Sequence, residues 1–411
     1  MRHSRKIFFV SFAFLLTISI LSQCMVKDDV VTIKNTEGEQ YVGSASCKTC
    51  HRSVYSSFIN TAHYNDSRPA SEKTIKGSFE KNKNYFLYGF NINQAVVMED
   101  RDSGFYEVAY INRKEKEAHR FDIVIGSARK GQSYLYWNAN KLFQLPISYF
   151  TPSNSWINSP GYPPDHIVFN RTISGRCLEC HSTYAKQPEP KNAVEARPST
   201  DFDHNQIIYG IDCERCHGPA AKHVTFHVQN PQEKTGKFIL NPAGFSRQQR
   251  LDLCALCHSG AREALKPAFS YKPGDTLSNY FKSNPTATTN TNLDVHGNQY
   301  GLLLASTCFI KSKTMDCSSC HNTHVKERDN LAVFSQRCMN CHTQSNHTSC
   351  KMAATLGNTI KQNCIDCHMP VQASKVLRIQ NPASNDMVSA QVRSHLIAIY
   401  AEETQKFLKR K

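Results

Sequence analysis

The spacing Cys-x-x-Cys-His occurs seven times in this 411-residue chain, and no other feature constrains its folding as strongly. The chain holds 17 cysteines and 18 histidines, a composition from which chance would give about 0.03 copies. Because the copies are spread along most of the chain, most of the fold must accommodate whatever they bind. The copies are CKTCH (Cys47, Cys50, His51), CLECH (Cys177, Cys180, His181), CERCH (Cys213, Cys216, His217), CALCH (Cys254, Cys257, His258), CSSCH (Cys317, Cys320, His321), CMNCH (Cys338, Cys341, His342) and CIDCH (Cys364, Cys367, His368).

Three chemistries use pairs of cysteines at this spacing. Zinc explains the cysteine pairs but not a histidine directly after every one of them. A redox dithiol has the same weakness. In c-type haem attachment the two thiols form thioether bonds with the two vinyl groups, and the next residue, histidine, lies beneath the iron as an axial ligand. The sequence therefore predicts seven covalently attached haem c groups, with zinc sites and redox disulfides as the weaker alternatives.

The spare histidines are numerous enough to supply a second axial ligand to every haem. Ten remain once the seven motif histidines and His3 of the leader are set aside. His324 follows His321 by one helical turn and cannot reach the opposite face of the same porphyrin, so we expect it to bind a neighbouring haem. Iron bound by two histidines has no open position for a substrate. The predicted distal ligands are His63, His166, His223, His296, His324, His347 and His395.

The chain opens with basic residues and then a 15-residue apolar run, Ile7 to Leu21. This is the form of a secretory signal, and the run falls short of the about 20 residues that cross a bilayer. The residues before Cys24 resemble a bacterial lipobox, although Gln23 replaces the usual small residue. We expect lipid on Cys24 and thus membrane association, with a plain secreted form and a retained anchor as alternatives. All three export the chain, and we expect a periplasmic or outer-membrane lipoprotein of a Gram-negative bacterium, with surface exposure as an option.

The chain is strongly basic, with a net charge of +15 and a pI near 9.1. Losing the leader and adding about one negative charge per ferric haem, from the propionates, would bring the charge to about +5. The basic residues are therefore expected to balance propionates, and we expect no nucleic-acid partner.

We expect a mainly α fold with much irregular loop, in which short helices wrap around a stack of c-type haems. Porphyrin faces would supply much of the buried apolar surface of such a chain. A small antiparallel β insertion is expected in the gap between the first two motifs, where β-branched and aromatic residues alternate with turns. We expect it to act as a structural brace, with a docking surface or a lid as alternatives. Its predicted strands are Tyr85–Ile92, Gln94–Glu99, Gly104–Ile111, His119–Gly126 and Gln132–Trp137.

Motif spacing and composition predict six segments. The predicted boundaries are 1–23 for the signal peptide, 24–40 for a tether, 41–80 for a first haem module, 81–160 for the β-rich haem-free insertion, 161–275 for a module with three motifs, and 276–411 for a second module with three motifs and a C-terminal helix.

Several segments resemble a known family. YVGSASCKTCHRSVYSSFINTAH resembles the opening of the cytochrome c-552/4 type domain, and CERCHGPAAKH and NCIDCHMP are similar to segments of multihaem cytochromes c. The resemblance implies closely stacked haem pairs with mostly bis-histidine iron. It also implies distal-ligand roles for the residues at matching positions, which are His63, His223, His324 and His347.

The leading functional hypothesis is an electron-transfer cytochrome, which relays electrons between donor and acceptor redox proteins. The alternative is an enzyme that acts on a small nitrogen or sulfur oxyanion at one five-coordinate haem, and a structural role for the haems is a third possibility. The enzyme would need a pocket above that iron, for which the spare candidates are His119, His204, His227, Arg129 and Lys130. Neither the redox partners nor the oligomeric state can be read from the sequence.

Overall fold

The computed structural model describes residues 32–88, 93–188, 199–282, 293–294, 296–342, 350–380 and 386–409. The expected signal segment 1–23 and Cys24 lie outside the described residues. Within the described part of the chain, no helix is both long enough and apolar enough to cross a bilayer.

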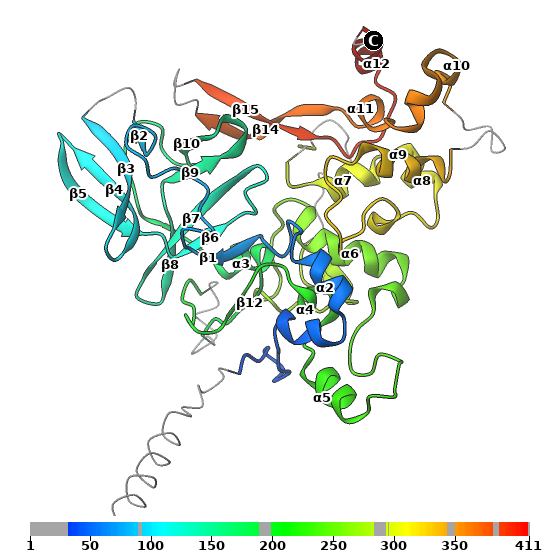
Figure 1. The fold of residues 1–411 in the computed structure, drawn as a ribbon, viewed down its shortest axis with the longest axis horizontal. Helices are drawn as coiled ribbons and strands as arrows, with labels where there is room; N and C mark the ends of the chain where they lie inside the picture. The colour runs from blue at the N-terminus through cyan, green and yellow to red at the C-terminus, as the bar shows by residue number, and fades with distance from the viewer. Residues whose placement is uncertain are drawn as a thin grey trace, which may run out of the picture.

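The expectation of a mainly α fold is wrong. The chain is 29% helical and 25% strand, and its strands form several antiparallel sheets. The expectation took the short helices of the motif-bearing segments as typical of the whole chain. The segments that pack against no porphyrin must satisfy their buried backbone N–H and C=O groups by hydrogen bonds within the protein. Where apolar residues alternate with polar ones, antiparallel sheets form these hydrogen bonds and bury one face. Figure 1 shows the two large sheets on one side of the molecule and most of the motif-bearing helices on the other.

The first sheet lies between the first two motifs and contains most of the predicted strands. It is antiparallel, in the order β2-β3-β4-β5. The prediction for Gly104–Ile111 is confirmed over its full length, and the turn before it places Gly104 at a φ of 125°, which favours glycine. The strands are β2 (Tyr85–Leu87), β3 (Gln94–Arg101), β4 (Gly104–Ile111) and β5 (Lys114–Arg120).

The second sheet extends the β region well beyond the predicted insertion. Its order is β1-β6-β7-β8-β11, with β9 paired to β7 and β10 paired to β9. The predicted strand His119–Gly126 is divided between the two sheets, because β5 ends at Arg120 and β6 begins at Ile123. The strands are β1 (Ser67–Pro69), β6 (Ile123–Ile125), β7 (Gly131–Asn138), β8 (Lys141–Gln144), β9 (Ile147–Phe150), β10 (Ser155–Asn158) and β11 (Arg171–Thr172).

A conventional hydrophobic core holds the two sheets together. Val96 and Met98 of the first sheet and Tyr134 of the second are fully buried in it, and Trp156 is 2% exposed. Burying large aromatic and aliphatic side chains contributes about 1.5–3 kcal/mol each. This part of the chain therefore has a stabilising core without any porphyrin.

Two hairpins complete the β structure. β12 (Ser182–Ala185) pairs with β13 (Ile207–Tyr209), directly after the CLECH motif. β14 (Val371–Gln380) pairs with β15 (Met387–Arg393), and Ile379 packs on Ile157 of β10. In Figure 1 this second hairpin runs from the last helices across to β10, so it joins the end of the chain to the large sheets.

The helices are short, and most of them carry or follow a motif. The longest, α6 (Arg247–His258), has 12 residues and ends on the CALCH histidine. The other α-helices are α2 (Arg52–Phe58), α3 (Gly175–His181), α4 (Cys213–His217), α5 (Ala221–Gln229), α7 (Gln299–Leu304), α8 (Thr307–Lys311), α9 (Leu331–Met339), α10 (Ala353–Leu356), α11 (Ile365–His368) and α12 (Ala401–Lys409). The 3₁₀ helices include η1 (Ser44–Thr49), η2 (Thr151–Ser153), η4 (Pro242–Gly244), η5 (Leu277–Asn279), η7 (Cys317–Ser319) and η8 (Gly357–Lys361).

One carboxyl group lies inside the core between the sheets. Glu107 of β4 is fully buried, and its Oε2 accepts a hydrogen bond from the backbone N–H of Ile147 at 3.1 Å. Its Oε1 has no hydrogen-bond partner among the described residues. Burial raises the pKa of Glu107 well above its ordinary value, so the group keeps its proton to a higher pH in the folded protein than in the unfolded chain.

We expect Glu107→Gln to stabilise the β region increasingly as pH rises. In unfolded chains the carboxyl group ionises above about pH 4.5, whereas the folded protein retains the proton, so wild-type stability falls by about 1.4 kcal/mol per pH unit until the folded pKa is reached. Glutamine does not titrate. The free energy of unfolding of the variant should equal that of the wild type near pH 4 and exceed it by about 1–3 kcal/mol near pH 8.

Urea unfolding followed by tryptophan fluorescence measures this difference, because both tryptophans, Trp137 and Trp156, lie in the β region. The exposed Glu72→Gln is the control and should show no pH-dependent gain. Equal pH dependence for Glu107→Gln and the wild type would contradict the assignment.

Candidate haem-ligating sites

Each motif folds as a tight helical turn, which brings its histidine below its first cysteine. The backbone N–H of His51 donates to the carbonyl of Cys47 at 2.8 Å, and that of His321 donates to Cys317 at 3.0 Å. This i to i−4 bond is the repeat of an α-helix, so the first thiol and the imidazole lie about one turn apart. The geometry suits two thioether bonds at one porphyrin edge and a ligand beneath its centre.

Aspartates directly before two motifs fix these turns. Asp212 accepts from the backbone N–H of Glu214 and caps α4, and Asp316 caps η7 by accepting from Ser318 and Ser319. An N-terminal cap of this kind typically contributes about 1 kcal/mol. Asp316 also pairs with Arg250 of α6 at 2.5 Å, which anchors the CSSCH turn to the helix that bears CALCH.

Four histidine pairs face one another at nearly the same separation. Two imidazoles on opposite sides of one metal ion keep their bound nitrogens about 4 Å apart, which places their ring centres about 6 Å apart. Rings in direct contact lie much closer, as for His204 on Trp137 at 3.7 Å. The facing pairs, with their centroid separations, are His51–His223 at 6.4 Å, His63–His258 at 6.1 Å, His217–His324 at 6.1 Å and His321–His395 at 6.2 Å.

Hydrogen bonds set the tautomer of several of these rings. The Nδ1–H of His217 donates to the carbonyl of Leu240, and that of His223 donates to the carbonyl of Lys237, both at 2.8 Å. A carbonyl oxygen can only accept, so Nδ1 must carry the proton and Nε2 keeps its lone pair. A lone pair on Nε2 is what an iron ligand requires.

Burial also favours the neutral form of five of the facing rings. It lowers the pKa of His63, His258, His321 and His324, and it lowers that of His395 to about 4. A neutral imidazole is the form that binds metal. The separation of the rings therefore fits an iron ion between each pair, and the tautomer or the lowered pKa of individual rings agrees with it.

The structure brings together four of the predicted distal ligands with motif histidines, and the partners come from different motifs. His324 faces His217 of CERCH rather than His321, three residues before it. That His324 serves a neighbouring haem stays a prediction, and which motif it faces could not be read from the sequence. His63, His223 and His395 likewise face histidines of motifs other than the one nearest in sequence.

The other three predicted distal ligands stay predictions. His166 is exposed and its Nδ1 bonds Asp165 at 2.8 Å, and His296 is also exposed. His347 lies outside the described residues. The described residues place no imidazole opposite His181 or His368 at the separation of the four pairs, and His342 borders the undescribed segment 343–349.

Cysteine thiols show which motifs are neighbours. Each contacting pair takes one cysteine from each of two motifs, so the porphyrin edges tethered there would lie side by side. Two further pairs of thiols lie close enough to interact electrostatically, Cys216 with Cys254 and Cys320 with Cys338. The thiols that lie close enough to shift each other's pKa are Cys47 and Cys213, Cys180 and Cys257, Cys254 and Cys317, and Cys338 and Cys364.

A buried carboxylate within the CERCH motif holds two of these neighbours together. Glu214, 2% exposed, accepts from the backbone N–H groups of Gly43 and Ala220, both at 2.8 Å. Asp212 accepts from the N–H of Ser44 at 3.2 Å. Both acidic side chains therefore bind the segment that leads into CKTCH, a role that the motif spacing did not indicate.

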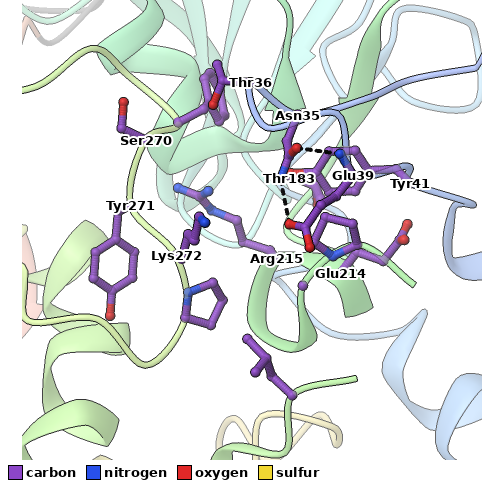
Figure 2. Close-up of a pocket in the computed structure, with 15 residues that line it drawn as sticks. Asn35, Thr36, Glu39, Tyr41, Thr183, Glu214, Arg215, Ser270, Tyr271 and Lys272 are labelled. Atoms are coloured by element: carbon purple, nitrogen blue, oxygen red, sulfur yellow. Dashed lines mark hydrogen bonds between the residues drawn. The ribbon is translucent and has the colours of Figure 1, made fainter. Parts of the chain in front are cut away.

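A small cavity lies next to this junction. It has a volume of about 60 Å³, and Figure 2 shows Glu214 and Arg215 lining it beside Tyr41 and Lys272. Ligand pockets are usually about 300–1,000 Å³, whereas one water occupies about 30 Å³. The cavity therefore has room for water rather than for an organic substrate.

The two cysteines left over by the motifs in the described part of the chain, Cys308 and Cys350, are not joined in a disulfide. Cys308 is close enough to Cys320 and Cys341 for electrostatic interaction between the thiols. Cys350 is close enough to Cys367 for the same interaction. They therefore neighbour different motifs.

Comparison with known proteins shows similarity to multihaem cytochromes. The family model for cytochrome c554 and c-prime matches residues 166–218, which include CLECH and CERCH. The multiheme cytochrome MtrA of Shewanella baltica (strain OS185) is 24% identical over 181 residues, covering 41% of this chain and 52% of MtrA. This chain thus spans about half the length of that curated relative.

The fold is similar to a solved structure, the crystal structure of the outer cell wall cytochrome OcwA. The TM-score is 0.55 at 18% sequence identity, and the match covers 89% of this chain and 81% of OcwA. At this identity the likeness shows the fold alone. Together the sequence matches and the seven attachment motifs support a multihaem c-type cytochrome with covalently bound haem c.

Proposed function

We propose that this chain is a heptahaem cytochrome that relays single electrons through closely spaced haems, most of them ligated by two histidines. The observation that carries the proposal is the set of four imidazole pairs facing across about 6 Å. Each haem would supply an iron that cycles between the ferric and ferrous states. The chain's own part is to tether each porphyrin by two cysteines and to hold its iron from both sides, so that little rearranges when an electron arrives.

The thiol contacts support a continuous order of sites. The proposed row is CKTCH, CERCH, CALCH, CSSCH, CMNCH and CIDCH, with CLECH beside CALCH as a branch, and neighbouring thiols support each of these steps. CALCH, at the end of α6, would thus be the junction of three neighbours. Electrons entering at one end of the row can pass to the other end without leaving the protein.

The enzyme alternative, a reaction on a small oxyanion, is not favoured by the comparisons. Two of the residues that such a pocket would use are engaged elsewhere. His119 packs on Tyr136 at 3.9 Å, and His204 stacks on Trp137. We therefore assign His119 and His204 to packing.

We further propose that the chain is exported and bound to a membrane through lipid on Cys24, and that it passes electrons between two redox proteins. Attachment of haem to Cys-x-x-Cys-His motifs takes place outside the cytoplasm, which supports export. OcwA, which has a similar fold, is an outer cell wall cytochrome. Redox partners would dock near the ends of the haem row.

The mass of the mature protein should equal that of its polypeptide and lipid plus seven haems. In the double variant Cys177→Ser/Cys180→Ser the added mass should be that of six haems. Removing both thiols leaves the CLECH porphyrin no covalent link. Intact-mass spectrometry measures the count. Cys308→Ser, which lies outside every motif, is the control and should retain all seven. A wild-type count below seven would contradict the proposal.

The variant His324→Ala should convert one iron from low spin to high spin. His324 faces the CERCH histidine, so its loss opens one axial position while the covalent link remains. Ferric EPR should show about one new high-spin centre per protein. The control His204→Ala removes a histidine that stacks on Trp137 and should leave the spectrum unchanged. An unchanged spectrum for His324→Ala would argue against this ligand pair.

A further inference from the structure

His181 of the CLECH motif differs from other motif histidines in the partner of its Nδ1. That atom lies 2.8 Å from Oδ2 of Asp66. The corresponding nitrogens of His217 and His368 donate to the backbone carbonyls of Leu240 and Ala398, also at 2.8 Å. A carbonyl is neutral, whereas an aspartate brings a full negative charge to the ring.

The β region, not the motif, holds Asp66 in place. Its N–H donates to the carbonyl of His63 at 3.1 Å, and its carbonyl accepts from the N–H of Gly126 at 2.5 Å. It immediately precedes β1, whose first residue, Ser67, pairs with Ile125 of β6. The side chain is 25% exposed. The carboxylate is thus fixed by a sheet that carries no haem motif.

The charge acts mainly on the CLECH histidine. Oδ2 of Asp66 lies 2.8 Å from Nδ1 of His181, so the carboxylate contacts the ring of this histidine directly. Asp66 also interacts electrostatically with His63 and His258, the facing pair next to the Cys180–Cys257 contact, but it bonds neither of them. Its effect should therefore be larger at the CLECH site than at the neighbouring CALCH site.

We propose that Asp66 is a positioning residue that lowers the reduction potential of the CLECH haem. A hydrogen bond to a carboxylate makes the ligand more electron-donating, and a nearby negative charge favours ferric over ferrous iron. The inference rests on the proposed attachment of a haem at each motif.

The consequence concerns the branch in the haem row. If haems are held at both motifs, one electron would pass from a ferrous haem at CALCH, which would become ferric, to the ferric haem at CLECH, with no bond made or broken. Asp66 would make this transfer less favourable, so the branch would be filled later than it would be without the carboxylate. The β region would thereby control access to the side haem without binding it covalently.

The test is a potentiometric titration of the purified protein, followed by haem absorbance and EPR. In Asp66→Asn the reduction potential of one haem should rise by about 59 mV. At a fixed applied potential this raises the ratio of its reduced to its oxidised form about tenfold, because the transfer involves one electron. Asp66→Ser, which also removes the charge, should shift the same haem in the same direction. Asp66→Glu retains the carboxylate and should stay closer to the wild type.

The matched control is Glu117→Gln, which removes a carboxylate 2.6 Å from His119, a histidine outside every motif. It should leave all potentials unchanged. Unchanged potentials in Asp66→Asn and Asp66→Ser, with seven haems present, would overturn the inference. So would loss of a haem from both uncharged variants but not from Asp66→Glu, because Asp66 would then act in assembly. A wild-type protein with fewer haems would instead refute the proposed function, which the intact-mass measurement decides separately.

Discussion

The proposed haem-bearing half of the molecule depends on pairs of imidazoles that reach the same point in space from distant parts of the chain. His63, just after the first motif, faces His258 of the fourth, and His321 of the fifth faces His395, which follows the last. A metal ion between such rings would act as a cross-link between segments that share few other contacts. Together with two thioether bonds per porphyrin, these cross-links would replace much of the apolar core that a chain of this length would otherwise need.

The two kinds of stabilisation occupy different regions. The β region buries aromatic and aliphatic side chains between its sheets, as Tyr134 and Trp156 illustrate, and can form a core without cofactor. The motif-bearing helices are short and depend on local caps such as Asp212 and Asp316. The regions meet where Asp66 of the first contacts His181 of the second. The sheets are therefore more than an inserted brace, because they bring a charge to one motif.

Sequence reasoning succeeded where the signal is local. The strand Gly104–Ile111 was predicted with its observed limits, because alternating side chains and a flanking turn are short-range features. It failed for the fold class, because weak strand signals such as Ser67–Pro69 and Arg171–Thr172 become strands only when a neighbouring strand supplies hydrogen bonds. Asp66 was missed for the same reason, since no local pattern links it to a histidine 115 residues away.

The sequence by itself determined the cofactor chemistry, because two thiols and a histidine within five consecutive residues fix how a porphyrin is attached in one helical turn. It also limited the second ligands to a small set of spare histidines. Only the tertiary structure decided which of them faces which motif, and which motifs are neighbours. The physical reason is steric: a ligand on the far face of a porphyrin cannot come from the turn that holds the near face, so it must come from a segment that folding alone brings there.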